Sequence, residues 1–263
     1  MQPNQDIAAI LTLVVYAAIA VACVAWQVRR KAGRLGLWLL YTVEKIYAPF
    51  FFHWRANRRC PFPDDGSAII LANHRSPVDP VFVWAQHHLS GPSGRVRPIS
   101  FMTAKEYFDV PGVGWICRTL NSIPVSRNGA DMAPVREALR RLQNDELIGV
   151  FPEGRINRGE GLLPGDPGIA WLALTSKVPV YPVFVHDAPQ GRSMIEPFCT
   201  PTRVRVSYGD PIDLSAYYGQ RKTRELLQEV TDFMMARLGQ LGGLDDFTKE
   251  NEPPTLSITR ATG

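Results

Sequence analysis

Cysteine is scarce in this chain, and no two cysteines stand close together. The widely spaced cysteines are Cys23, Cys60, Cys117 and Cys199. No C-x-x-C pair is present, which argues against zinc ribbons and thioredoxin-like redox motifs. We therefore expect free, buried thiols in a reducing compartment.

A strong charge of one sign is lacking as well. The net charge is +4, from 29 Lys and Arg against 25 Asp and Glu, and the pI is near 8.9. This mild excess of positive charge does not indicate a nucleic-acid-binding protein. The 263 residues, 45% hydrophobic and 21% charged, suffice for one sizeable core. We find no internal repeat.

One long uncharged segment stands out, running from Ile7 to Trp26. Twenty helical residues span roughly 30 Å, the thickness of a bilayer's hydrocarbon core. The alternative is a cleaved signal peptide, with Ala20-Val21-Ala22 as its cleavage site. However, the preceding MQPNQD lacks a basic residue, and signal peptides have a positive start and a shorter apolar run. The pattern predicts an uncleaved transmembrane helix.

Basic residues follow that helix at once: Arg29, Arg30, Lys31 and Arg34. The positive-inside rule predicts a single-pass membrane protein whose remainder lies on the cytoplasmic face. Residues 1–34 then form the anchor with its basic flank.

The next segment, Leu35 to Trp54, is rich in aromatic residues. Glu44 and Lys45 interrupt it, which argues against a second span. Its tryptophans and tyrosines favour the membrane interface. Two interpretations stay open: a helix lying in the headgroup plane, or a core helix of the following domain. We assign residues 35–65 to this interfacial or amphipathic segment.

From residue 66, short β-branched runs alternate with amphipathic segments. Strands are predicted at residues 67–72, 97–103, 122–126, 147–151, 178–185 and 203–209. Helices are predicted near residues 80–89, 105–119, 132–144, 166–176 and 221–241. This alternation predicts an α/β domain over residues 66–243, with a mostly parallel sheet flanked by helices. The polar tail, residues 244–263, is expected to be disordered.

The first predicted strand ends just before His74, and Asp79 stands five residues further on. On a regular helix that separation is a rotation of about 140°, so the two side chains meet only if the chain turns between them. Ser76-Pro77 suits such a turn, as an N-cap followed by a first helical residue. Asp79 can then accept the Nδ1–H of His74 and leave Nε2 free to take a proton. Alternatively, Ser76 and Asp79 form a capping box and nothing more.

A second group of residues follows the strand predicted at 147–151. There Glu153-Gly154-Arg155 and Arg158 form a glycine-containing, doubly basic loop. Glycine lets backbone N–H groups approach an anion, and an arginine side chain can donate two parallel hydrogen bonds to a phosphate. Arg127 and Lys105 also come at or after strand ends, and in open α/β sheets sites gather beyond those ends. Taken singly, each basic residue is better explained as a solvated surface charge. Several of them at the same end of one sheet are not so easily explained in that way.

These motifs resemble the blocks of the 1-acylglycerol-3-phosphate acyltransferase family, in the same order. NHRSPVDP resembles the Asn-His-x4-Asp block, SIPVSR the block that ends in arginine, FPEGR the Phe-Pro-Glu-Gly block and VPVYPV the Val-Pro-rich block. The resemblance spans about residues 66 to 215. It implies that the 66–243 domain is an acyltransferase domain.

The resemblance also implies roles for the motif residues. His74 would be the general base and Asp79 its orienting partner. Arg127 and Lys105 would contact the phosphate of the acceptor, and Glu153 and Gly154 would shape the acceptor site.

Two departures from the family pattern concern the acceptor. The third block usually continues Gly-Thr-Arg, whereas here Gly154 is followed by Arg155, with Arg158 later. Either arginine can therefore take the phosphate role. The segment Pro164–Gly168 lacks the basic residue that often precedes the next helix.

The implied reaction moves an acyl chain from acyl-CoA or acyl carrier protein to the free hydroxyl of 1-acylglycerol 3-phosphate. It gives phosphatidate, in phospholipid synthesis. The expected partners are the lipid bilayer, a lysophospholipid acceptor and the acyl carrier; no cofactor, metal or nucleic acid is expected. Three alternatives remain: another acceptor (glycerol 3-phosphate, another lysophospholipid or a glycolipid), a metal-dependent hydrolase using His74 and Asp79, and a non-catalytic lipid binder. Against the hydrolase, the other histidines show no metal-ligand spacing.

Overall fold

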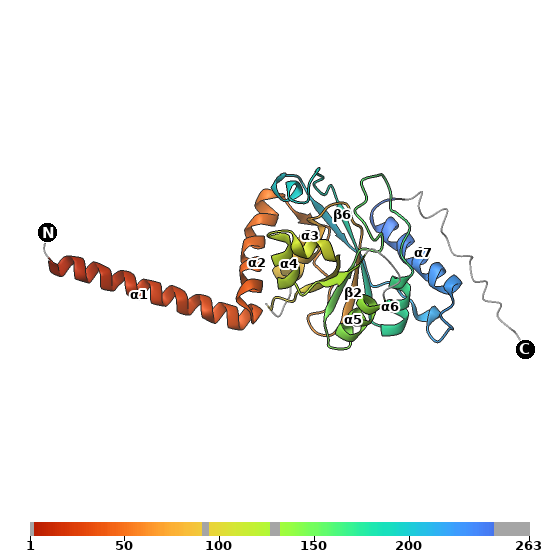
Figure 1. Cartoon of the computed structure of the whole chain (residues 1–263), viewed down its shortest axis with the longest axis horizontal. Coiled ribbons are helices and arrows are strands. Elements are labelled where there is room, and N and C mark those ends of the chain that lie inside the picture. The colour runs from red at the N-terminus through yellow and green to blue at the C-terminus, as the bar shows by residue number, and fades with distance from the viewer. Residues whose placement is uncertain (1–2, 91–94, 127–131, 245–263) are drawn as a thin grey trace, which may run out of the picture.

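A computed structural model describes residues 3–90, 95–126 and 132–244. Within them, strands from the whole length of the domain form one sheet in the order β1-β7-β6-β2-β5-β3-β4 (Figure 1). The strands are β1 (Arg55–Ala56), β2 (Ala68–Ala72), β3 (Ile99–Ala104), β4 (Ile123–Val125), β5 (Leu147–Val150), β6 (Val180–His186) and β7 (Arg205–Tyr208). Arg127 and the predicted tail beyond Leu244 lie outside the described residues.

The sheet is mostly parallel, as the sequence predicts. The pairs β2–β6, β2–β5, β3–β5 and β3–β4 are parallel, whereas β7 runs antiparallel to β6. All six predicted strands are present. The two-residue strand β1, parallel to β7, was not predicted, because two residues are too short for any periodicity.

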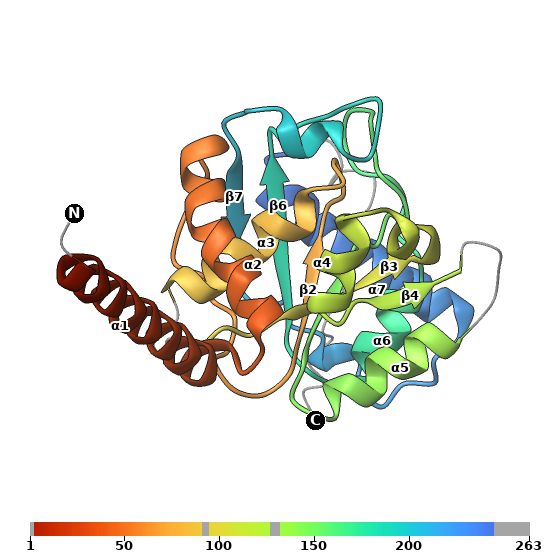
Figure 2. The same ribbon diagram turned by 60° about the vertical axis from the view of Figure 1, so that its left-hand side comes forward.

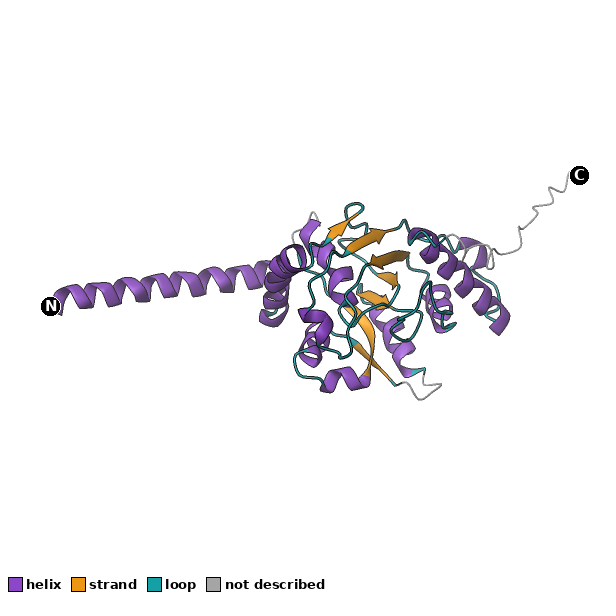
Figure 3. Ribbon diagram, turned by 90° about the horizontal axis from the view of Figure 1, so that it is seen from above, coloured by secondary structure: helices purple, strands orange, loops and turns teal. Residues whose placement is uncertain are grey.

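Helices cover both faces of the sheet, and Figure 3 shows the strands stacked between two groups of them. The helices on the sheet are α2 (Leu35–Ile46), α3 (Asp79–Ser90), α4 (Val113–Thr119), α5 (Ala133–Leu142), α6 (Gly168–Ser176) and α7 (Arg224–Leu241), and the N-terminal helix α1 (Pro3–Gln27) precedes them. Short π-helical turns are η1 (Val28–Ala32) and η2 (Tyr47–Phe51), and 3-10 turns are η3 (Lys105–Asp109), η4 (Glu196–Cys199) and η5 (Ser215–Tyr217).

The helix predicted over residues 105–119 is instead two elements, η3 and α4. Pro111-Gly112 separates them. Proline disfavours a helical residue before it, and Val110 is extended. Gly112 has a φ of 79°, which a residue with a side chain rarely adopts. After the break α4 packs back against η3, where the Arg118 guanidinium donates to the Phe108 carbonyl at 2.9 Å.

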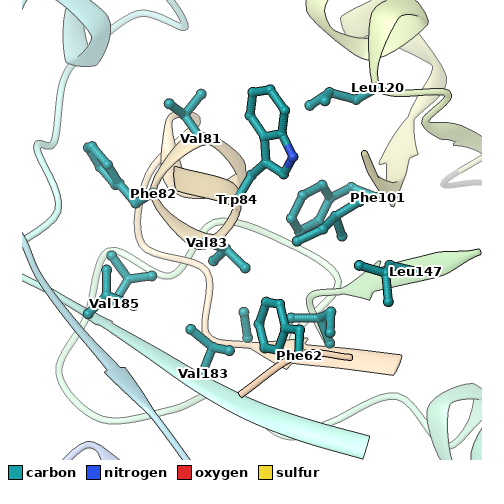
Figure 4. Close-up of a cluster of buried hydrophobic side chains, with 14 of the residues drawn as sticks. Phe62, Val81, Phe82, Val83, Trp84, Phe101, Leu120, Leu147, Val183 and Val185 are labelled. Carbon is teal, nitrogen blue, oxygen red and sulfur yellow. The ribbon is translucent and has the colours of Figure 1, made fainter. Parts of the chain in front are cut away.

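Each face of the sheet carries its own core. Alternate residues of β2 point to opposite faces: Ile70 packs with α2, α3 and α4, and Ile69 packs with α5, α6 and α7. Figure 4 shows the first core, where Trp84 of α3 lies beside Leu120 and Phe101.

The segment from residue 35 to 65 combines the two interpretations left open by the sequence. One face of α2, with Leu37, Leu40 and Tyr41, is buried in the first core. The opposite face exposes Val43 and Ile46, with Leu35 and Leu39 along the same side. Hence α2 is a core helix whose outer face is also apolar.

The N-terminal helix projects away from the rest of the molecule (Figure 1). The segment Ile7–Ala32 is long and apolar enough to cross a membrane, with a mean hydropathy of 2.7 and none of that window buried. Its base is tied to the domain, because Val96 N–H donates to the Lys31 carbonyl at 2.8 Å. The Arg34 guanidinium also donates to Asn121 Oδ1, at 3.0 Å.

The four thiols are free, as predicted, but Cys23 and Cys199 are exposed rather than buried. Cys23 lies on the outward-projecting α1, and Cys199 ends η4 at the surface. Burial raises the pKa of the Cys60 thiol to about 12.

Candidate active site

The predicted site residues lie at the carboxyl-terminal edge of neighbouring strands. His74 follows β2, Glu153 follows β5, and Lys105 follows β3. These three strands are adjacent and parallel, so the loops that follow them meet at one edge of the sheet. Arg127, just beyond β4, lies outside the described residues.

The His74 and Asp79 side chains are in contact. His74 Nδ1 lies 3.0 Å from Asp79 Oδ2, and the carboxylate is fully buried. The chain turns at Ser76-Pro77 and α3 begins at Asp79, as the sequence predicts. Because Oδ2 is an acceptor, it selects the neutral tautomer with the proton on Nδ1, and Nε2 is free to accept another proton.

The same carboxylate oxygen also holds the turn. Asp79 Oδ2 accepts the N–H groups of Arg75 at 2.6 Å and Ser76 at 2.7 Å. Capping and orientation of His74 are therefore two effects of one side chain. Asp79 Oδ1 is buried without a hydrogen-bond partner among the described residues. The negative charge of the carboxylate is therefore stabilised by the donors to Oδ2.

Aromatic stacking fixes the plane of the imidazole. The His74 ring lies 4.1 Å from the Phe151 ring at an interplanar angle of 16°, and Phe151 stacks in turn on Phe101. The stacking contact with Phe151 and the hydrogen bond to Asp79 leave the imidazole few orientations. His74 retains a small exposed fraction, because one edge faces a cavity.

Glu153 joins the two motif loops. Its Oε1 accepts the backbone N–H of His74 at 2.8 Å, and its Oε2 accepts the Asn157 side-chain amide and the Leu163 N–H, both at 2.9 Å. Asn157 N–H returns a bond to the His74 carbonyl at 2.7 Å. Burial raises the pKa of the Glu153 carboxyl, although these donors oppose the rise. Its two carboxylate oxygens are therefore occupied by two backbone N–H groups and one side-chain amide of the protein itself.

A cavity of about 450 Å³ opens beside His74. Apolar side chains from β3 and α4 line one part, including Phe101, Val113, Ile116 and Leu120. Its polar members include Ser122, Ser126, Arg155 and Asp166. A largely apolar hollow with a few convergent polar groups is the usual form of a site for an amphiphilic molecule.

The structure places the two candidate arginines differently. Arg155 and Gly154, which has a φ of 66°, line the cavity. Arg158 is exposed, donates to the Gly191 carbonyl at 3.2 Å, and is absent from the described residues that line the cavity. Lys105 is exposed too, and its neighbours Ala104 and Tyr107 contact the cavity in its place.

Several residues of this site were not predicted. The lining residues of α4 do recur at helical spacing, at Val113, Ile116, Cys117 and Leu120, which is a pattern that the sequence offered. By contrast, Met194 and Phe198 reach the cavity from the β6–β7 connection, and no local pattern marks them. In the described part of the chain, no three His, Cys, Asp or Glu side chains are grouped to hold a metal ion.

A solved structure shares this fold. It is that of the 1-acyl-sn-glycerophosphate acyltransferase PlsC from Thermotoga maritima, with a TM-score of 0.57, covering 89% of this chain and 92% of the other at 23% identity.

Three bacterial proteins named 1-acyl-sn-glycerol-3-phosphate acyltransferase are similar in sequence. The one from Escherichia coli is 28% identical over 69% of this chain and 73% of its own length. The one from Haemophilus influenzae is 29% identical over 66% and 69%, and the one from Bacillus subtilis 23% identical over 68% and 83%. Residues 55–186 match the acyltransferase family. That match spans half of the chain and contains both motif loops, so this protein belongs to the acyltransferase family and is an O-acyltransferase.

Proposed function

We propose that this enzyme transfers a fatty acyl chain from acyl-CoA or acyl carrier protein to the free hydroxyl of 1-acylglycerol 3-phosphate. The product is phosphatidate, a precursor in phospholipid synthesis. The observation that carries the proposal is that the His74–Asp79 pair and Arg155 meet at one apolar cavity. The names of the related bacterial proteins support the same acceptor.

In the proposed reaction, the acceptor hydroxyl attacks the thioester carbonyl carbon. His74 Nε2 takes the hydroxyl proton as the new C–O bond forms. The tetrahedral oxyanion then collapses, the C–S bond breaks, and the leaving thiolate recovers the proton from the imidazolium. Asp79, held by three donors, orients His74 and stabilises its positive charge. The protein forms no covalent intermediate.

The cavity separates the apolar and the charged parts of the substrates. An acyl chain fits the apolar part between β3 and α4, lined by Ile116 and Leu120, because burial of its methylenes is favourable. The acceptor phosphate lies at Arg155, where the guanidinium can make two parallel hydrogen bonds to its oxygens. Gly154 lets the backbone come close, and Lys105, which is exposed and follows the cavity-lining Ala104, adds positive charge. The motif resemblance assigns the same role to Arg127.

Arg155→Ala should raise the Michaelis constant for the acceptor by about ten- to a hundred-fold, the effect of losing a charge-assisted hydrogen bond to phosphate. Arg158→Ala tests the other candidate arginine, which is not among the described cavity residues. Arg136→Ala is the matched control, because Arg136 is exposed on α5 and is also outside the described cavity residues. Steady-state kinetics with lysophosphatidate, compared with a monoacylglycerol lacking the phosphate, measures all three variants.

The result would be contradicted if wild-type enzyme used both acceptors equally well, or if Arg155→Ala changed only the constant for the thioester. A larger effect of Arg158→Ala would place the phosphate on the other side of the loop. The same assay with glycerol 3-phosphate, other lysophospholipids and glycolipids tests the alternative acceptors.

We further propose that α1 crosses the membrane once and that the catalytic domain lies on the cytoplasmic face, next to the basic residues that follow α1. If α1 stands along the membrane normal, α2 runs at a steep angle to it (Figure 1). The exposed apolar face of α2, with Val43 and Ile46, then lies in the interface. This placement keeps the active site beside the acceptor and the product, which are both lipids.

Deleting residues 1–30 should weaken binding to phospholipid vesicles without abolishing it, because the outer face of α2 remains. The deletion keeps Lys31, whose carbonyl accepts the Val96 N–H. Adding Val43→Ser and Ile46→Ser to the deletion should remove the residual binding, as a vesicle flotation assay would show. The topology would be refuted if a protease applied from outside the cell removed the folded domain.

A further inference from the structure

The connection between β6 and β7, residues 187–204, crosses the edge of the sheet that carries the active site. We refer to it as the strap. Two of its side chains, Met194 and Phe198, line the cavity. Both are partly exposed as well, and Ile195 between them is exposed at the surface of the strap.

Hydrogen bonds hold the strap on three sides. Ser76 Oγ donates to the Pro189 carbonyl at 2.5 Å, and Arg158 donates to the Gly191 carbonyl. The Tyr47 hydroxyl of η2 donates to the Phe198 carbonyl. Burial, together with the neighbouring Cys199, raises the pKa of Tyr47 to about 12, so this donor keeps its proton at physiological pH. The strap is thus fixed both to the catalytic loop and to the end of α2.

Apolar side chains are exposed where the strap meets η2. Phe50 of η2 is 75% exposed, and Ile195 of the strap is 54% exposed. Figure 2 shows the blue-green η4 of the strap at the same end of the molecule as the upper end of α2. Single exposed apolar residues are common on protein surfaces, but a contiguous exposed apolar patch marks a site for a partner or a lipid.

These residues continue a larger apolar surface. The exposed face of α2 runs through Leu39, Val43 and Ile46 toward Phe50. One end of this surface is the base of α1, and the other is the strap over the cavity. A surface that begins at a membrane anchor and ends at an apolar cavity suits a hydrocarbon chain that leaves the bilayer.

We propose that the strap and η2 form the port through which the acceptor's own acyl chain reaches the active site from the bilayer. Phe50 and Ile195 form its outer rim, and Met194 and Phe198 its inner wall. The proposal rests on the function proposed above. The acceptor chain stays in this port while its phosphate reaches Arg155 and its hydroxyl reaches His74. The apolar space at α4 is left for the chain of the thioester.

The test compares two lysophosphatidates in detergent mixed micelles, one with an eighteen-carbon chain and one with a water-soluble six-carbon chain. The double variant Phe50→Ser, Ile195→Ser should lower kcat/KM for the long-chain acceptor by about ten-fold, the effect of losing an apolar contact with the chain. The value for the short-chain acceptor and the Michaelis constant for the thioester should not change. Phe50→Leu, Ile195→Leu is the matched control, because it keeps an apolar side chain at the same two exposed positions and should leave the ratio of the two acceptors unchanged.

The outcomes separate this proposal from the proposed function. If wild-type enzyme acylates neither lysophosphatidate, the function fails. Suppose that wild-type enzyme acylates both. The port proposal is then wrong if the port variant lowers kcat/KM equally for both acceptors, or if the control variant changes the ratio of the two kcat/KM values as much as the port variant does. A photoreactive lysophosphatidate with its label in mid-chain gives an independent readout on wild-type protein. We expect cross-links within residues 47–52 and 194–198; cross-links confined to α4 would overturn the proposal.

Discussion

Replacing His74 with alanine is expected to lower turnover by about 10²–10⁴-fold, the usual effect of removing a general base. His74 supplies Nε2 to the cavity, and no other histidine is among the described cavity residues. The fold should survive, since the side chain lies in a loop at a strand end and its backbone bonds to Glu153 and Asn157 do not depend on the imidazole.

Initial rates and thermal unfolding of the same preparation would measure both effects. The matched control is His186→Ala, which removes a partly buried imidazole bonded to Ser207 rather than to the site, and should keep most of the activity. His74 would not be the base if the alanine variant retained more than a tenth of the wild-type rate.

Asp79→Asn should also reduce turnover by at least about 10²-fold, because an amide no longer imposes the tautomer of His74. The structure adds a stability cost. Oδ2 accepts three donors and Oδ1 is buried without a partner among the described residues. An amide therefore either buries its NH2 unpaired or turns it toward three N–H groups, at a cost of about 1–3 kcal/mol.

Two readouts distinguish the roles of this carboxylate. Asp213→Asn is the control for local capping alone, since Asp213 is exposed and accepts the Ser215 N–H outside the described cavity. It should alter neither rate nor unfolding temperature by much. If Asp79→Asn lowered the unfolding temperature but left the rate intact, Asp79 would be a capping residue and His74 would be oriented by other groups.

The sheet could be predicted because each of its main strands is a short apolar run bounded by turn residues. The antiparallel direction of β7 could not be predicted, because the hydrophobic pattern of a strand does not indicate whether it pairs parallel or antiparallel to its neighbour. The nature of α2 was ambiguous for a physical reason: core and bilayer both select apolar side chains. Leu40 and Val43 are both aliphatic, and only the fold decides that one is buried and the other exposed.

In the site, the predictable contact is the one between residues close in sequence. His74 and Asp79 are joined by a turn that Ser76-Pro77 indicates in the sequence. By contrast, Glu153 binds the His74 backbone from 79 positions away, which no local pattern indicates. Tyr47 and Phe198 are 151 positions apart. Arg155 and Arg158 have the same chemistry in one loop, so the sequence could not separate them. The conformation of that loop does so by turning one of them to the cavity.

The bridge made by Glu153 bears on how related enzymes can be recombined. Residues 73–79 and 152–163 are held together by Glu153 and by the Asn157 bond to the His74 carbonyl, so they form one structural unit. In a chimera that takes only the first segment from a relative, the Glu153 carboxylate would still be positioned to accept the N–H of the original His74 loop. A slightly different backbone there would weaken that hydrogen bond. Both segments have to be transplanted together, and a screen for altered acceptor use would gain most from libraries that vary them as a pair.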